Sequence, residues 1–132
     1  MKFKDELIEA TILKRYQRFL SDIELPAGEE ICAHVPNTGR MDTCWEPGWK
    51  VYLSHHDNPK RKLKYTLELK NNGNTLLGLN TSFTNKIAHE ALQNNLIPEL
   101  ANFDEIFPEK KILDSRIDFY LESSDGEQTA YV

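Results

Sequence analysis

The chain has 132 residues, of which 39% are hydrophobic and 28% charged; this composition excludes a disordered chain, and no apolar run approaches the roughly 18 residues of a membrane-spanning helix. The start lacks the apolar core of a secretory signal and the two cysteines are too few for a disulfide framework, so we expect a cytoplasmic, reduced protein with no membrane partner. The net charge of −5 does not exclude a polyanionic partner, because binding follows the local electrostatic potential. Residues 99–132 carry nine acids and three bases, whereas residues 1–98 carry twelve acids and thirteen bases.

The first eighty residues show the alternating apolar pattern and the turn residues of a β protein. Residues 9–25 form one long extended stretch whose alternation slips near Tyr16, which indicates a bulge or bend within a single strand. Further strands are predicted at 30–35, 49–54, 62–70 and 75–79. Five strands, the first long and bent, predict a small barrel of the oligonucleotide/oligosaccharide-binding (OB) type, because a bent first strand can serve both of its sheets.

The period changes after Asn80. Apolar residues at helical spacing predict a helix over 83–92, with Thr81 or Ser82 as its N-cap. Strands are predicted at 105–113, 115–121 and 128–132. These elements are too few to bury a core alone, and the chain ends inside a predicted strand. We therefore expect a barrel domain at 1–79 and the beginning of a second, incomplete domain at 80–132.

A block of bases between predicted strands is the first candidate site. Such a cluster neutralises phosphates, and nearby aromatic residues (Trp45, Trp49 and Tyr52) can stack single-stranded bases. The alternative is a solvated loop beside aromatic side chains that belong to the core. The bases, which have no acid between them, are Lys60, Arg61, Lys62 and Lys64.

The segment Ala-His-Val-Pro-Asn-Thr-Gly-Arg at 33–40 is the second candidate. A loop containing Asn37 and Thr38 displays backbone N–H groups and a hydroxyl, and Arg40 adds a positive charge, so the loop can hold a phosphate. The alternative is that Asn37 and Gly39 only satisfy an unusual turn.

Asp118 is the third candidate. In a strand over 115–121 it shares a face with Arg116 and Tyr120, whereas Ile117 and Phe119 point into a core. A carboxylate in a buried strand is costly unless it is paired or bound to a metal. The alternative is an ion pair of Asp118 with Arg116 or with a lysine on an exposed strand. A zinc site is not expected, because no zinc-finger spacing joins the cysteines and histidines: Cys32, His34, Cys44, His55 and His56.

Segments along the whole chain, including the run at 33–40, resemble the bacterial sugar fermentation stimulation protein A (SfsA) family. The resemblance implies a barrel followed by a PD-(D/E)xK nuclease-like domain, DNA binding and a link to the regulation of sugar utilisation. It also implies that Asp118 is a position for Mg²⁺ and that Glu90 is a further acid on the metal side. The other segments are Asn85 and residues 47–48, 58–63, 65–66, 78–81, 90–92, 97–100 and 115–119.

The chain departs from the family pattern at its end. In the family, the strand that begins like residues 130–132 continues into Glu-x-Lys, which would complete the metal site. Because that motif is absent here, we expect no cofactor and no working nuclease in this chain.

The leading prediction is therefore a DNA-binding protein that contacts the backbone with little sequence readout. One alternative is a Mg²⁺-dependent nuclease in the full-length form, of which this chain is an inactive fragment. Another is a barrel that binds protein or carbohydrate. The sequence leaves a homodimer open.

Overall fold

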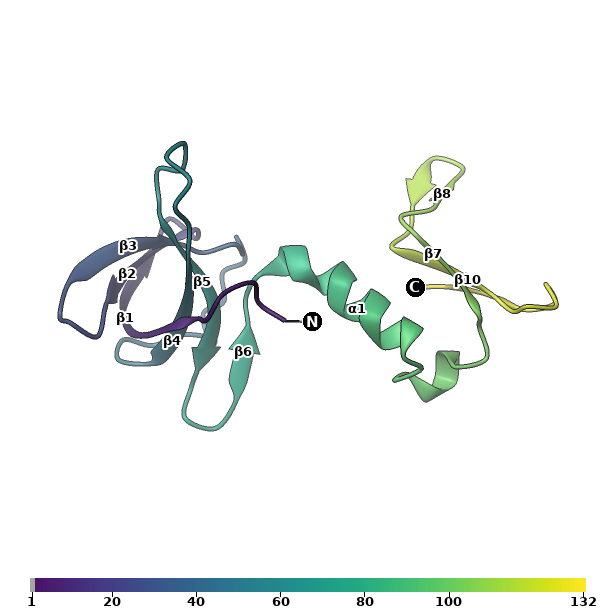
Figure 1. The fold of residues 1–132 in the computed structure, drawn as a ribbon, viewed down its shortest axis with the longest axis horizontal. Helices are drawn as coiled ribbons and strands as arrows, with labels where there is room; N and C mark the ends of the chain where they lie inside the picture. Colours follow the sequence, from purple (N-terminus) through teal and green to yellow (C-terminus); the bar gives the residue numbers. More distant parts are fainter. Residues whose placement is uncertain (1) are drawn as a thin grey trace. The chain divides into compact units, whose positions relative to one another are not determined.

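The computed structural model describes residues 2–132, and the chain divides into two units, residues 2–82 and 83–132 (Figure 1). A sheet of six strands forms the first unit. The order is β3-β2-β1-β4-β5-β6, and a parallel pairing of β3 with β5 closes β1–β5 into a barrel. This is the predicted mainly β fold with a five-stranded OB-like barrel. The strands are β1 (Ile8–Tyr16), β2 (Leu20–Glu24), β3 (Glu30–His34), β4 (Lys50–His55), β5 (Tyr65–Asn71) and β6 (Leu76–Gly78).

The predicted single strand over 9–25 is wrong, because it is the hairpin of β1 and β2. Tyr16 pairs with Leu20, and the three residues between them form the turn. Gln17 and Arg18 have φ of 48° and 65°, which allows this tight reversal without a glycine. The fifth barrel strand is consequently β5, and the strand predicted at 75–79 is β6, which lies outside the closed ring.

The barrel core comes from alternate residues of the strands. Ile12, Ile23 and Leu53 are completely buried, as alternation predicts. In β5 the alternation is interrupted: Leu67 pairs with Leu53 but Leu69 pairs with Tyr52, which leaves Glu68 as an extra residue. This bulge turns Lys70 toward the core, so Leu69 does not continue the face of Leu67.

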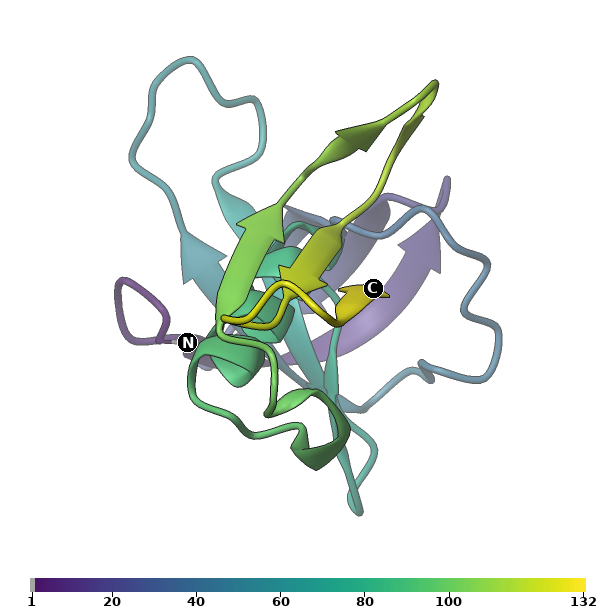
Figure 2. The same cartoon turned by 90° about the vertical axis from the view of Figure 1, so that its right-hand side faces the viewer.

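The second unit packs one helix on a small sheet of order β11-β10-β7 (Figure 2). Its core is built on Leu92, Phe119 and Leu121. A separate hairpin joins β8 to β9. The elements after the barrel are η1 (Thr81–Phe83), α1 (Thr84–Gln93), η2 (Pro98–Leu100), β7 (Glu105–Pro108), β8 (Lys111–Ile112), β9 (Ser115–Arg116), β10 (Phe119–Glu122) and β11 (Thr129–Tyr131).

Three predictions for this unit need correction. The helix is preceded by a 3₁₀ turn, and its N-cap residue is Phe83, which makes no side-chain capping bond; neither Thr81 nor Ser82 is the cap. The strand predicted over 105–113 is interrupted by Glu109, whose φ of 58° ends β7. The strand predicted over 115–121 is likewise divided into β9 and β10. Among residues 2–132, no helix has the length and apolarity to cross a membrane.

Candidate functional site

The predicted basic block lies on the loop between β4 and β5, which extends beyond the barrel strands (Figure 1). Lys60, Lys62 and Lys64 are exposed. The loop is ordered by its backbone: Arg61 N–H donates to the carbonyl of Asn58 (3.0 Å), and the Asn58 side chain accepts from Lys60 N–H (3.0 Å). Across the described residues, no carboxylate forms an ion pair with any of the three lysines, so their charge faces solvent.

Arg61 differs from its neighbours because it anchors the loop. It is half-buried, and its Nη2 donates to Thr66 Oγ1 on β5 at 3.0 Å. The same hydroxyl lies 3.2 Å from His56 Nε2, which is also 3.0 Å from Ser54 Oγ. Burial, and then the nearby Arg61 charge, lower the pKa of His56, so this imidazole stays neutral at neutral pH.

The network ends on a buried carboxylate. Glu68 is 4% exposed; it accepts from Ser54 Oγ at 2.7 Å and from Asn80 Nδ2 at 2.9 Å. Hydrogen bonds therefore connect the basic loop to the barrel wall through β4 and β5. Sequence reasoning missed this network, since only the bulge at Glu68 shows that an acid sits beside Ser54.

The second candidate loop is built around a residue that the sequence did not single out. Arg15, at the end of β1, donates to the carbonyls of Arg18 (2.5 Å), Asn37 (3.1 Å), Gly39 (2.7 Å) and Arg40 (2.6 Å). Loop residues 37–40 are thus held by backbone contacts to one guanidinium.

Within this loop the three predicted residues have different surroundings. Asn37 Oδ1 accepts from Gly39 N–H at 2.9 Å, which is the turn contact of the alternative interpretation. Thr38 is exposed. Arg40 is exposed and forms an ion pair with Asp42 at 3.0 Å, which offsets part of its charge.

The aromatic residues near the basic block belong mainly to the core. Trp45 and Trp49 are partly buried and pack against the barrel core, as the alternative interpretation states. Tyr65 also packs there, and its ring lies 4.9 Å from that of His55. The Tyr16 hydroxyl lies 3.4 Å from Cys32 Sγ, within hydrogen-bonding distance.

Asp118 lies between β9 and β10 and is exposed, so the prediction of a carboxylate within a buried strand is wrong. The Asn85 amide on α1 donates to Asp118 Oδ1 and to Glu109 Oε1, each at 3.0 Å. Arg116 forms its ion pair with Glu109. Glu90 is exposed on α1.

These side chains do not complete a cation site. Mg²⁺ requires near-octahedral oxygen ligands, whereas Asp118 and Glu109 are only two carboxylates, and Arg116 engages one of them. Within residues 2–132, no three His, Cys, Asp or Glu side chains are arranged to hold a metal.

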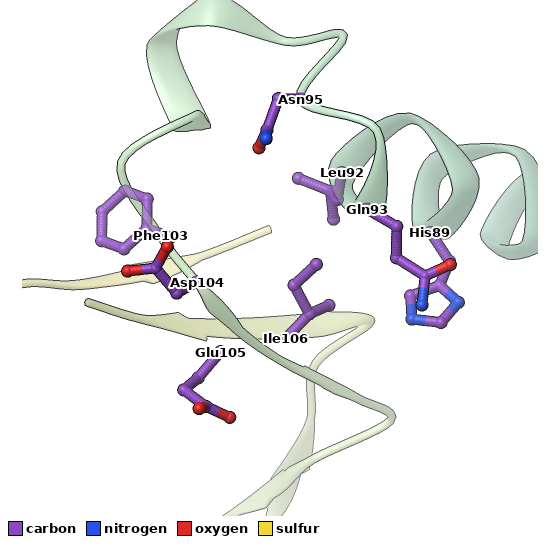
Figure 3. Close-up of a pocket in the computed structure, with 8 residues that line it drawn as sticks. All are labelled: His89, Leu92, Gln93, Asn95, Phe103, Asp104, Glu105 and Ile106. Atoms are coloured by element: carbon purple, nitrogen blue, oxygen red, sulfur yellow. The ribbon is translucent and has the colours of Figure 1, made fainter. Parts of the chain in front are cut away.

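The second unit also contains a cavity of about 460 Å³ between α1, β7 and the segment that connects them (Figure 3). Leu92, Phe103 and Ile106 give it an apolar part, and Asp104 and Glu105 give it an acidic rim. Its lining contains no lysine or arginine and none of the predicted site residues. A phosphate group would meet repulsion there. The remaining lining residues are His89, Gln93 and Asn95.

Comparison with known proteins finds two adjacent family matches. Residues 13–79 match the SfsA N-terminal OB domain, and residues 82–132 match the sugar fermentation stimulation protein RE domain. Proteins named sugar fermentation stimulation protein homolog are similar: that of Thioalkalivibrio sulfidiphilus is 46% identical over 100% of this chain and 56% of its own length, and that of Marinomonas sp. is 48% identical over 97% and 50%. The chain spans about half the length of the curated relatives it matches.

A solved structure has the same fold. The Pyrococcus furiosus SfsA structure in complex with Ca²⁺ aligns with a TM-score of 0.73 and 24% identity, over 99% of this chain and 54% of that protein.

Proposed function

The chain belongs to the sugar fermentation stimulation protein family, and on that premise we propose that it is a DNA-binding protein that contacts the phosphate backbone through the β4–β5 loop. One observation carries the proposal: Lys60, Lys62 and Lys64 are exposed, unpaired with any acid of the described chain, and displayed on a loop whose backbone is ordered. Lysines in this setting neutralise phosphates without reading sequence.

The neighbouring groups have distinct roles in this proposal. Arg61 supports the loop through Thr66 and adds positive charge. Thr38 and Arg40 are further contacts to the phosphate backbone of the DNA, because both side chains are exposed. Asn37 shapes the turn that presents them. We place this function in the cytoplasm, where the DNA lies.

The test compares two triple variants of the full chain by fluorescence anisotropy with single- and double-stranded DNA over a salt series. Replacing Lys60, Lys62 and Lys64 with alanine should weaken binding and reduce the slope of log K against log salt by about 3, at roughly 0.9 per lost phosphate contact on duplex DNA. The control replaces the exposed Lys2, Lys4 and Lys14 with alanine and removes the same net charge.

Equal slopes for the wild type and the loop variant, or equal losses in both variants, would overturn the assignment of the loop. Absence of binding to either form of DNA would favour the alternative of a barrel that binds protein or carbohydrate. We further propose that the DNA binding regulates carbohydrate-utilisation genes, for which the relatives' names are the support. Transcripts of sugar-catabolic genes in cells that carry the loop variant test this role.

A second candidate function is a Mg²⁺-dependent nuclease in the full-length form, with residues 80–132 as the start of its PD-(D/E)xK-like domain. The observation that favours it is the shared Asn85 amide, which holds the Asp118 and Glu109 carboxylates near each other. The solved relative is in complex with Ca²⁺. Since the described residues do not form a complete cation site, we expect no cleavage by this chain.

Plasmid cleavage with and without Mg²⁺ tests this alternative. The full-length protein should cut only with Mg²⁺, and Asp118→Asn should abolish cutting. Cleavage by the full-length Asp118→Asn protein would contradict the assignment of Asp118.

A further inference from the structure

Three buried side-chain atoms in the described part of the chain lack a hydrogen-bond partner: Arg15 Nε, Ser21 Oγ and Lys70 Nζ. Nearly all buried polar atoms in native proteins are paired, so each unpaired atom requires an explanation. All three carry N–H or O–H bonds, and two belong to cations. The partner that would satisfy all three is therefore an acceptor, and the two cations favour an anionic one.

The three residues face the interior at the same end of the barrel. Arg15 and Ser21 are directly opposite each other in the β1–β2 register, which places their Cβ atoms about 5 Å apart on one face. Ser21 is also opposite Ala33, which is completely buried. Lys70 is opposite Val51, another completely buried core residue, because the bulge at Glu68 turns it inward.

The electrostatics of Lys70 connect it to the same region. Burial and, next, the charge of Arg15 lower the pKa of Lys70 to about 8, while Cys44 acts in the opposite direction. Arg15 is therefore near enough for the two cations to repel. Cys44 belongs to the loop after β3, so this loop lies close to the end of the Lys70 side chain.

No carboxylate of residues 2–132 is bonded to either cation. Arg15 meets backbone carbonyls, and burial lowers its pKa against the opposing charge of Asp42, which forms its ion pair with Arg40. The buried Lys70 ammonium and the buried Nε edge of Arg15 consequently face the interior without a carboxylate partner. Burial of unpaired charge is costly, and an anion between the donors would offset that cost.

We propose that Arg15, Ser21 and Lys70 form an internal binding site for a monatomic anion of the size of chloride. The donors come from three strands, β1, β2 and β5, and face the same interior, so a spherical ligand could contact all three. Met41 and Trp45 of the loop after β3 pack against this core, and a closely packed interior favours a small anion over a phosphate group. This site is independent of the DNA contacts proposed above.

Urea unfolding of the full chain in sodium chloride and in sodium gluconate at matched ionic strength tests the site. Chloride should raise the unfolding midpoint of the wild type in a saturating manner, as expected for a ligand that binds only the folded state. Lys70→Met should abolish the chloride dependence. Ser21→Ala should raise the half-saturating chloride concentration about tenfold, which corresponds to the loss of one hydrogen bond to a charged group. The control Lys14→Met, on the exposed face of β1, should keep the wild-type response.

Diffraction from crystals soaked in bromide gives an independent readout, with an anomalous peak expected between the three donors. Equal midpoints in the two salts, or an unchanged chloride response in Ser21→Ala, would overturn the proposal. A bromide peak only at surface lysines means an adventitious ion only, which also overturns it. If Lys70→Met does not fold, Ser21→Ala and the bromide peak decide.

Discussion

Arg15 stabilises the loop between β3 and β4 through backbone carbonyls and, within residues 2–132, forms no ion pair with a carboxylate. Its guanidinium reaches four carbonyls, three of them in residues 37–40. A planar group with several fixed donors is suited to this task, whereas the compact ammonium of lysine is not. One side chain therefore determines the shape of a loop that contains three predicted site residues.

Arg15→Met should lower the free energy of unfolding by about 2 kcal/mol, less than the sum of its hydrogen bonds, because carbonyls near the surface can bond to water instead. Urea unfolding measures the loss. Lys14→Met, the exposed neighbour, should change stability by less than about 0.5 kcal/mol. Equal effects of the two substitutions would show that Arg15 does not hold the loop.

Lys70 should make stability depend on pH in gluconate buffer. Its folded pKa of about 8 lies below the ordinary value of 10.5, so the unfolded chain binds more protons between these limits. The free energy of unfolding should therefore rise from pH 8 to 10, by about 2 kcal/mol from this residue. Subtracting the pH profile of Lys70→Met isolates its effect, and parallel profiles would contradict the prediction.

At the scale of the elements, the β1–β2 hairpin turns through two residues whose backbone favours glycine. Gln17 and Arg18 both lie in the left-handed region. A side chain in that region costs about 1 kcal/mol relative to glycine. The turn thus stores strain that closure of the barrel overcomes.

Arg18→Gly should raise the free energy of unfolding by roughly 0.5–1 kcal/mol, since glycine relieves the positive φ. Gly28→Ala is the opposite case, because Gly28 has a φ of 85° in the β2–β3 turn. A Cβ at Gly28 would meet no atom within 4 Å, so any loss in the free energy of unfolding reports backbone strain alone. Thermal unfolding should move in opposite directions for the two variants. A shift in the same direction would refute the strain argument.

Local patterns predicted the strands wherever alternation and turn residues coincide. Val51 and Leu53 face the core as their spacing indicates, and the OB-like fold was predicted although the first predicted strand is two strands and the fifth, β6, lies outside the closed ring. The hairpin at Gln17 could not be predicted, because a positive φ at a residue other than glycine leaves no sequence signal. The same applies to Glu109, which ends β7.

The candidate site was predicted only in part. The exposed lysines of the basic loop follow from the absence of acids in that stretch. The anchoring of Arg61 by Thr66 and the inward orientation of Lys70 depend on pairing between distant strands. A bulge shifts that pairing by one residue. Because side chains alternate between the two faces of a strand, this shift moves every following side chain to the opposite face of the sheet.

For the whole molecule, charge is divided unevenly between the units. Residues 1–82 carry twelve bases and eleven acids, and residues 83–132 carry four bases and ten acids. The acidic second unit should repel DNA at low salt, whereas the barrel unit has its own core and carries the basic loop.

Residues 1–82 expressed alone should therefore bind DNA more tightly than the whole chain in 50 mM salt, with the difference vanishing as screening increases. Anisotropy measures the affinities, and circular dichroism confirms that the fragment is folded. Equal affinities at low salt for a folded fragment would show that the second unit does not oppose binding.

The barrel closes through a narrow seam. Only two residue pairs, Ala33 with Tyr65 and His34 with Thr66, join β3 to β5, whereas the β1–β2 and β2–β3 ladders each contain five. Opening this seam breaks fewer hydrogen bonds than opening any of those ladders, so amide exchange with deuterated solvent should begin there. The loop after β3 and the loop before β5 both adjoin this seam. Transient opening of the β3–β5 pairing would therefore loosen both of these loops, which carry the predicted lysine and arginine contacts, at the same time.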